Sequence, residues 1–195
     1  MDGVLLESYE AWFQVVNAAT RHFSKPDVSP DRFKAGWGQG VDADLRDFFP
    51  GCTQAQIERY YEDHLLDHGD QVRADVQARD VLCALRDAEV PRGVITNTPT
   101  FLARDMLAWT GLIGLVEVTV GAGDGQRAKP EPDMVLHACE LLQVPPQAVL
   151  VVGDSAFDEK AAKAAGAHFA GLRMSGKNSI QTLTDVLRYF EHQRS

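Results

Sequence analysis

The sequence contains few cysteines and no long apolar segment. Its 195 residues include three cysteines, which are Cys52, Cys83 and Cys139. An odd number of scattered cysteines, without a C-x-x-C pair, argues against a disulfide framework and against a structural zinc site. No stretch approaches the roughly 18 consecutive apolar residues of a membrane-spanning helix. We therefore expect reduced thiols and no membrane partner.

Positive charge is also scarce. The chain has 19 Lys and Arg residues against 28 Asp and Glu residues, which gives a formal net charge of -9. Nucleic acids and anionic membranes are bound through basic patches, so we expect neither as a partner. A small anionic substrate remains compatible, because one local site can be positive within an acidic protein. The opening residues lack the basic and apolar segments of a secretory signal, and we expect a cytoplasmic location.

The residues that are present can form a packed core. Hydrophobic residues make up 45% and charged residues 24%, and the length suits one domain with a modest insertion. Residues 9–75 show a helical period and no convincing strand. We expect helices from Tyr9, over 41–49 and over 54–68, with breaks at two X-Pro pairs between the first two.

Beyond residue 76 the pattern alternates between short apolar runs and amphipathic segments. The predicted strands are 90–96, 115–120, 148–152 and 168–172, and the predicted helices are 78–88, 100–110, 131–142, 156–165 and 180–192. Strands that alternate with helices indicate βαβ units and a parallel sheet. Continuous apolar runs agree, since parallel strands are covered on both faces. We therefore expect an α/β fold with a doubly wound parallel sheet.

Polar residues follow these strands at the sheet edge where α/β proteins bind ligands. Thr96 and Asn97 follow one strand and can donate hydrogen bonds to an anion, although a helix N-cap would use the same residue types. Lys129 stands before a proline in the stretch AKPEP, where it can hold a phosphate or be a solvated surface charge.

Two carboxylates follow the most apolar run, AVLVV. Asp154 comes directly after Gly153, and Asp158 lies four residues further at the start of a predicted helix. Oxygen ligands in that arrangement suit Mg²⁺. The alternative is a helix cap together with a first-turn acid that favours the helix dipole.

Taken together, four stretches resemble the haloacid dehalogenase superfamily in its phosphoglycolate phosphatase-like branch. They are MDGVLLES, GVITNTP, AKPEPDMV and VLVVGDSAFDEKAAKAAGA. The resemblance implies a Rossmann-like core, formed by residues 1–8 and 76–195. It also implies a small helical cap, formed by residues 9–75. Most members are Mg²⁺-dependent phosphatases, so the expected partner is a small phosphorylated metabolite.

The first motif of that family reads Asp, any residue, Asp, Gly. Asp2 and Gly3 match its second half, which places the nucleophilic aspartate directly before Met1. The resemblance also puts a central strand before that nucleophile, between the strands at 92–96 and 148–152. We expect this first central strand to be absent from the given sequence.

The resemblance further implies a role for each candidate residue. Asp2 is the general acid and base, while Thr96 and Lys129 neutralise the phosphoryl group. Mg²⁺ is held by the backbone carbonyl of Asp2, by Asp154 and by Asp158. Asn97 assists in binding the substrate. From the cap, Trp37 and Gly38 in the stretch GWGQG are expected to touch it, although a plain flexible loop would read the same way.

Two features sort the branches of the superfamily. Asp2 argues against the dehalogenases, which usually lack that acid. Gly153 argues against the sugar phosphomutases, which tend to carry an acidic residue there. The expected function is phosphoric monoester hydrolysis through an aspartyl-phosphate. The alternative is an inactive truncated protein that serves as a binding or regulatory module. The substrate and the oligomeric state are left open.

Overall fold

The computed structural model describes residues 1–123, 125–176 and 178–190. Its helices are α1 (Tyr9–His22), α2 (Pro30–Ala35), α3 (Val41–Asp47), α4 (Gln54–His64), α5 (Ala78–Asp87), α6 (Thr100–Trp109), α7 (Asp133–Leu142) and α8 (Ala156–Ala165). Its strands are β1 (Leu6–Glu7), β2 (Arg73–Ala74), β3 (Gly93–Pro99), β4 (Val118–Ala122), β5 (Leu150–Gly153), β6 (His168–Leu172) and β7 (Ser179–Ile180). Short 3₁₀ segments lie at Leu65–Gln71, Ile113–Leu115, Pro146–Ala148 and Leu183–Tyr189.

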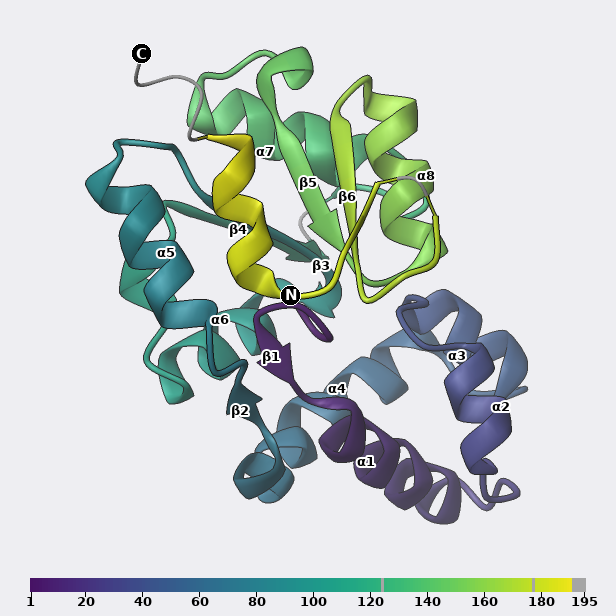
Figure 1. Cartoon of the computed structure of the whole chain (residues 1–195). Coiled ribbons are helices and arrows are strands. Elements are labelled where there is room, and N and C mark those ends of the chain that lie inside the picture. Colours follow the sequence, from purple (N-terminus) through teal and green to yellow (C-terminus); the bar gives the residue numbers. More distant parts are fainter. Residues whose placement is uncertain (124, 177, 191–195) are drawn as a thin grey trace.

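Helices α1 to α4 gather on one side of the molecule, apart from the long parallel strands (Figure 1). A capping box formed by Thr53 and Gln56 opens α4. Helix α2 was not predicted, because its Ser-Pro pair was interpreted as a break. Ser29 instead caps the helix by accepting from the Arg32 N–H, and Pro30 occupies the first turn, where its missing N–H costs nothing.

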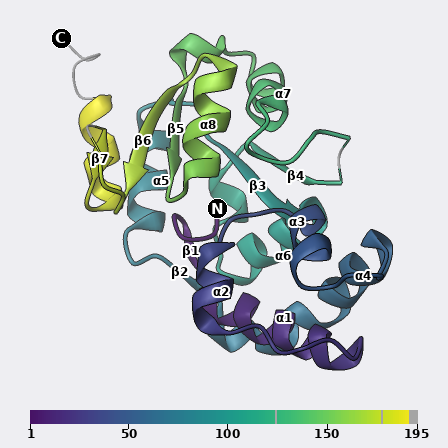
Figure 2. The same ribbon diagram turned by 90° about the vertical axis from the view of Figure 1, so that its right-hand side faces the viewer.

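The strands β3 to β7 form two parallel sheets flanked by helices, which confirms the α/β class. Strand β3 pairs with β4, and β6 lies between β5 and β7. Helices α6 and α7 pack on β3 and β4, while α8 packs on β5 and β6. Figure 2, turned by 90°, shows α7 and α8 beside these strands, on the side away from the helices that precede β2.

The two parallel sheets are not hydrogen-bonded to each other along β3 and β5. A cavity of about 230 Å³ lies between them, lined on one side by Val94 and Ile95 and on the other by Val151 and Val152. Met1 also borders this cavity. This is the place in the sheet to which the family resemblance assigns the first central strand.

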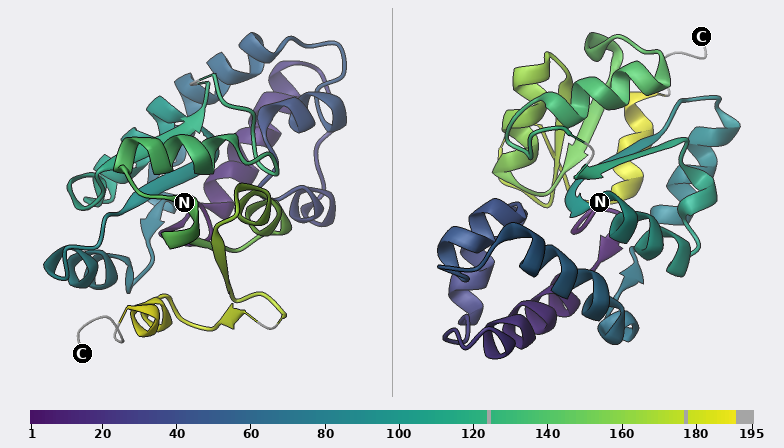
Figure 3. Two further views of the ribbon diagram at one scale, coloured as in Figure 1. Left: turned by 90° about the horizontal axis from the view of Figure 1, so that it is seen from above. Right: turned by 180° about the vertical axis from the view of Figure 1, so that it is seen from behind.

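A two-stranded antiparallel ladder stands where the chain enters and leaves helices α1 to α4 (Figure 3). Leu6 of β1 pairs with Ala74 of β2, and Glu7 pairs with Arg73. Two-residue strands are too short to show a period of two, so no sequence pattern predicts this pairing.

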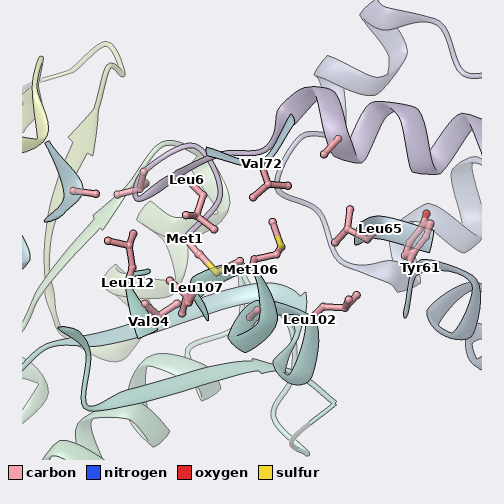
Figure 4. Packing of buried hydrophobic residues seen from close by; sticks show 14 of the residues in the cluster. Met1, Leu6, Tyr61, Leu65, Val72, Val94, Leu102, Met106, Leu107 and Leu112 are labelled. Atoms are coloured by element: carbon pink, nitrogen blue, oxygen red, sulfur yellow. The ribbon is translucent and has the colours of Figure 1, made fainter. Parts of the chain in front are cut away.

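One apolar core continues through this ladder. Leu6 and Met1 pack close to Val94 of β3 and Leu107 of α6, as Figure 4 shows. Leu6 and Leu107 are almost fully buried, with exposures of 1% and 0%. Burial of this kind contributes about 1.5–3 kcal/mol for each large aliphatic side chain, so the N-terminal turn is anchored at the end of the sheet.

Several predicted boundaries were displaced by a few residues. The strand expected at 90–96 is β3, Gly93–Pro99, and the run expected at 115–120 begins as a 3₁₀ turn before β4. The last predicted helix, 180–192, is a 3₁₀ segment at Leu183–Tyr189, and its end lies outside the described residues. Within the described ranges, no helix is long and apolar enough to cross a bilayer.

Candidate active site

The predicted site residues line one cavity of about 70 Å³, at the edge where β3 and β5 end. Core residues and cap residues both contribute to its wall. The candidate residues among them are Asp2, Trp37, Gly38, Thr96, Asn97, Lys129, Asp154 and Asp158. The four sequence stretches therefore converge on a common cleft, although the first ends at residue 8 and the last begins at residue 149.

Asp2 is held in one orientation by four side-chain donors. Ser8 and Trp12 donate to its Oδ1, at 2.6 and 3.3 Å respectively. Thr96 and Thr98 donate to its Oδ2, at 3.2 and 3.0 Å. Ser8 belongs to the stretch MDGVLLES, and Thr96 and Thr98 belong to GVITNTP. The fourth donor, Trp12, comes from α1.

Lys129 and Asp158 form a buried ion pair. The Nζ of Lys129 lies 2.7 Å from Oδ1 of Asp158, and the two side chains are only 7% and 8% exposed. Burial alone would raise the pKa of the Asp158 carboxyl. The charge of Lys129 and hydrogen bonds from Lys129 and Ser155 outweigh it and hold the pKa below its usual value.

Asp158 also caps helix α8. Its Oδ2 accepts from the backbone N–H and the hydroxyl of Ser155, while the Ser155 hydroxyl accepts from the Asp158 N–H. The side chain of Asp158 therefore both caps a helix and belongs to the candidate site, which the sequence pattern presented as alternatives. Gly153 makes room for it, because a Cβ at that position would lie 2.2 Å from the Asp158 Cβ.

Asn97 joins the Lys129 loop to the cap. Its Oδ1 accepts from the Lys129 N–H, and its Nδ2 donates to the Lys129 carbonyl and, at 2.9 Å, to the Gly38 carbonyl. The side-chain amide predicted to bind substrate is thus engaged with protein groups. Asn97 lines the cavity, so a ligand there can still contact its backbone.

Asp154 lies against the Asp2-Gly3 turn. A Cβ on Gly3 would stand 1.9 Å from Oδ2 of Asp154, and Gly3 has a φ of +71°, so only glycine fits here. The same oxygen accepts a hydrogen bond of 3.1 Å from the indole N–H of Trp37. Burial raises the pKa of the Asp154 carboxyl, and the Trp37 donor opposes the rise.

These groups fit Mg²⁺ in the chemistry of their donors. Carboxylate and carbonyl oxygens are the ligands that Mg²⁺ prefers, and it often uses only one or two carboxylates plus water and phosphate. Asp154 is partly desolvated by burial, and its Oδ2 lies close to the Gly3 backbone, next to Asp2. Within the described ranges, no group of three His, Cys, Asp or Glu side chains is already close enough to form a cage. Asp158 in particular has both oxygens engaged with Lys129 and Ser155.

The cap supplies residues that the sequence pattern did not single out as functional. Trp12 and Tyr61 lie on cap helices whose apolar period indicates only packing within the cap, and both also line the cavity. Asp44 belongs to no sequence motif, and it lines the same cavity. Trp12 differs from an ordinary core aromatic only in its hydrogen bond to Asp2. That contact joins two different regions of the fold.

Comparison with known proteins agrees with this geometry. A family model described as haloacid dehalogenase-like hydrolase matches residues 1–172. The chain belongs to this family. A phosphoglycolate phosphatase from Chromobacterium violaceum is 30% identical over 178 residues, which cover 85% of this chain and 79% of that protein.

Solved structures share the fold of this family member. A Lactobacillus plantarum protein, provisionally assigned as a phosphoglycolate phosphatase, gives a TM-score of 0.83 at 24% identity and covers 96% of this chain and 95% of its own. CbbY from Rhodobacter sphaeroides, solved in complex with phosphate, gives a TM-score of 0.82 at 16% identity, with coverages of 95% and 92%. The predicted Rossmann-like haloacid dehalogenase fold is confirmed, as is the prediction of a phosphoric monoester hydrolase.

Proposed function

We propose that this haloacid dehalogenase-like hydrolase cleaves the phosphate ester of a small metabolite with Mg²⁺, through an aspartyl-phosphate. The observation that carries the proposal is the convergence of Asp2, Thr96, Lys129 and Asp154 on one cavity beneath the cap. Relatives named as phosphoglycolate phosphatases support the reaction class. The proposed division of the chain is a core of residues 1–8 and 76–195 with a cap of residues 9–75.

In this proposal Asp2 moves the proton in both halves of the reaction. Its carboxyl lies in the cavity wall, where it can protonate the leaving alcohol oxygen and then accept a proton from the attacking water. The hydroxyls of Thr96 and Thr98 and the donors Ser8 and Trp12 keep the carboxyl aimed at that position. Orientation of this kind matters because a displacement of about 1 Å can cost on the order of a hundredfold in rate.

Lys129 balances negative charge at the phosphoryl position. Its ammonium group is the one cationic side chain that lines this cavity among the described residues. It is pinned by Asp158, so the charge needs no reorganisation as the transition state forms. When bound, Mg²⁺ would supply Lewis-acid stabilisation of the phosphoryl oxygens, and the carboxylate of Asp154 and the carbonyl of Asp2 would hold it.

The nucleophile of the proposed reaction is an aspartate directly ahead of Met1 in the working polypeptide. The cavity of about 230 Å³ between β3 and β5 supports this, because an apolar strand inserted there would pair both facing strands and deliver its last residue to the Asp2 turn. Gly153 supports a phosphatase over a mutase, since an acidic side chain there would clash with Asp158.

The test compares two polypeptides with p-nitrophenyl phosphate and Mg²⁺. One begins at Met1, and the other carries the native upstream residues, identified by mass spectrometry of the protein from its source. We expect turnover only with the longer form, and loss of that turnover when its last upstream Asp is changed to Asn. Turnover by the form that begins at Met1 would refute the assigned nucleophile. Absence of turnover in both would favour the alternative, a binding or regulatory module.

A further inference from the structure

The cap side of the active-site cavity has an unusual chemical composition. Its wall is built from aromatic and aliphatic side chains, which are Trp12, Val16, Phe33, Trp37, Val41, Phe48 and Tyr61. The phosphoryl group belongs near Lys129 and Asp154, and within this wall the indole N–H of Trp37 contacts Asp154. The other side chains of the wall remain for the rest of the substrate. The alcohol portion of a bound ester therefore faces this apolar wall.

No basic side chain of the cap reaches the cavity within the described residues. Arg32 donates to the Asp47 carbonyl and stacks over the Phe48 ring at 5.3 Å, on the outer surface. Arg46 pairs with Asp47, and Lys25 donates to the carbonyl of Pro50. The cap thus offers no cation to a second negative charge on the substrate.

The ionisable group that the cap does supply is a carboxyl. Asp44 of α3 lines the cavity, with Gln39 donating to its Oδ1 at 2.9 Å and Tyr61 donating to its Oδ2 at 3.1 Å. Each oxygen keeps a further lone pair for another donor. Burial raises the pKa of this carboxyl to about 6, despite the two hydrogen bonds. It is therefore ionised at neutral pH and adds negative charge to the cap wall.

We infer that the alcohol portion of the substrate carries no negative charge, and that Asp44 accepts a hydrogen bond from its hydroxyl, amide or ammonium group. This inference rests on the proposed function. A carboxylate such as that of glycolate would be buried against Asp44 without a cation to compensate, which is strongly unfavourable. The cavity of about 70 Å³ is also far smaller than pockets for drug-sized ligands, so the alcohol is small.

The experiment uses two esters that differ only in charge, phosphoglycolate and its carboxamide, glycolamide phosphate. With the full native polypeptide we expect kcat/KM for the amide to exceed that for the acid by at least about fivefold at pH 7.5. A ratio below that value, or a preference for the acid, would overturn the inference. 2-Aminoethyl phosphate should follow the amide rather than the acid.

Turnover of p-nitrophenyl phosphate in the same preparation separates the two proposals. If no ester is hydrolysed, the proposed phosphatase function fails, and the inference is then decided by binding. Trp12 and Trp37 line the cavity, so tryptophan fluorescence reports the affinity for each ester without turnover. An affinity for the amide at least about fivefold higher than that for the acid supports the inference, and a smaller ratio refutes it.

A matched pair of variants locates the effect. Asp44→Asn should reduce the amide-to-acid ratio by at least about threefold, through KM more than kcat, because it removes the repelling charge. Asp47→Asn removes a carboxylate three residues away that does not line the cavity, and it should leave the ratio unchanged. Equal effects of the two substitutions would refute the role of Asp44. If the Asp44 variant does not fold, the wild-type ratio still decides the inference.

Discussion

The ammonium group of Lys129 lies 2.7 Å from Oδ1 of Asp158, and both side chains are more than nine-tenths buried. Asp158 at the same time caps α8 through Ser155. One contact therefore links the loop after β4 to the helix after β5 in the wall of the active-site cavity. Stability and the charge balance of the site both depend on this pair.

Changing Lys129 to Met should damage stability and activity together. The substitution leaves the Asp158 carboxylate buried without its cation, which costs about 3–5 kcal/mol in free energy of unfolding. Turnover should fall by about a hundredfold or more, because the phosphoryl charge loses its partner. Urea unfolding and p-nitrophenyl phosphate hydrolysis measure the two effects. Lys163→Met, on the exposed face of α8, is the control and should change neither.

The double variant Lys129→Met with Asp158→Asn separates these two roles. We expect it to regain much of the lost stability, because no buried charge remains unpaired. Its activity should stay low. Recovery of both properties would show that Lys129 acts only as a structural partner of Asp158.

Replacing Gly3 by Ala should disrupt the contact between the N-terminal turn and Asp154. The added Cβ would fall 1.9 Å from Oδ2 of Asp154, so the carboxylate or the turn must move. Gly51→Ala is a close control, since Gly51 has a φ of +86° and nothing within 4 Å of the added Cβ.

We expect the free energy of unfolding of the Gly51 variant to fall by about 1 kcal/mol from backbone strain alone. The free energy of unfolding of the Gly3 variant should fall further, and this variant should also lose most of its Mg²⁺-dependent turnover. Thermal unfolding and Mg²⁺ titration of activity check this. Equal behaviour of the two variants would show that Asp154 does not require the close approach.

Mg²⁺ binding should change the fluorescence of Trp37. Its indole N–H donates to Oδ2 of Asp154, so a cation on that carboxylate alters the charge next to the ring. We expect a saturable signal in Mg²⁺ titrations of the wild type, which Trp37→Phe and Asp154→Asn abolish. Trp109→Phe should retain it, because Trp109 is exposed and does not line the cavity. A signal that persists in Asp154→Asn would place the cation elsewhere.

Asp44 should make stability depend on pH between about 4 and 6. Burial raises the pKa of its carboxyl to about 6 from the ordinary value of 3.8, so the folded state holds the proton more tightly than the unfolded chain does. This contribution is present below pH 4 and is lost as pH rises through 6. Relative to wild type, Asp44→Asn should therefore gain on the order of 1–3 kcal/mol in unfolding free energy from pH 4 to pH 7.

Urea unfolding of both proteins across this range measures the difference. The absolute stability of the variant is not diagnostic, because Asn loses one of the two acceptors used by Gln39 and Tyr61. A difference between the proteins that stays flat with pH would contradict the raised pKa.

Local chemistry in the sequence determined much of the core. The helix at Ala156–Ala165 and the strand at His168–Leu172 were predicted with their observed bounds. The helix has a capping residue before it and a glycine after it, and the strand is a short apolar run. Each of these signals depends only on residues that are close in the sequence. The sequence also predicted that Thr96, Lys129 and Asp154 converge on one cavity, since parallel strands bring the residues after them to one edge.

Only the tertiary structure decided how the cap completes the site. Trp37 reaches Asp154 across 117 positions of the chain, and Trp12 reaches Asp2 from a helix whose period indicates nothing but core packing. Asp44 has no motif, and the role proposed for it rests on its place in the cavity wall and on its hydrogen bonds with Gln39 and Tyr61. Such contacts depend on where whole elements pack against each other, which periodicity and capping signals do not encode.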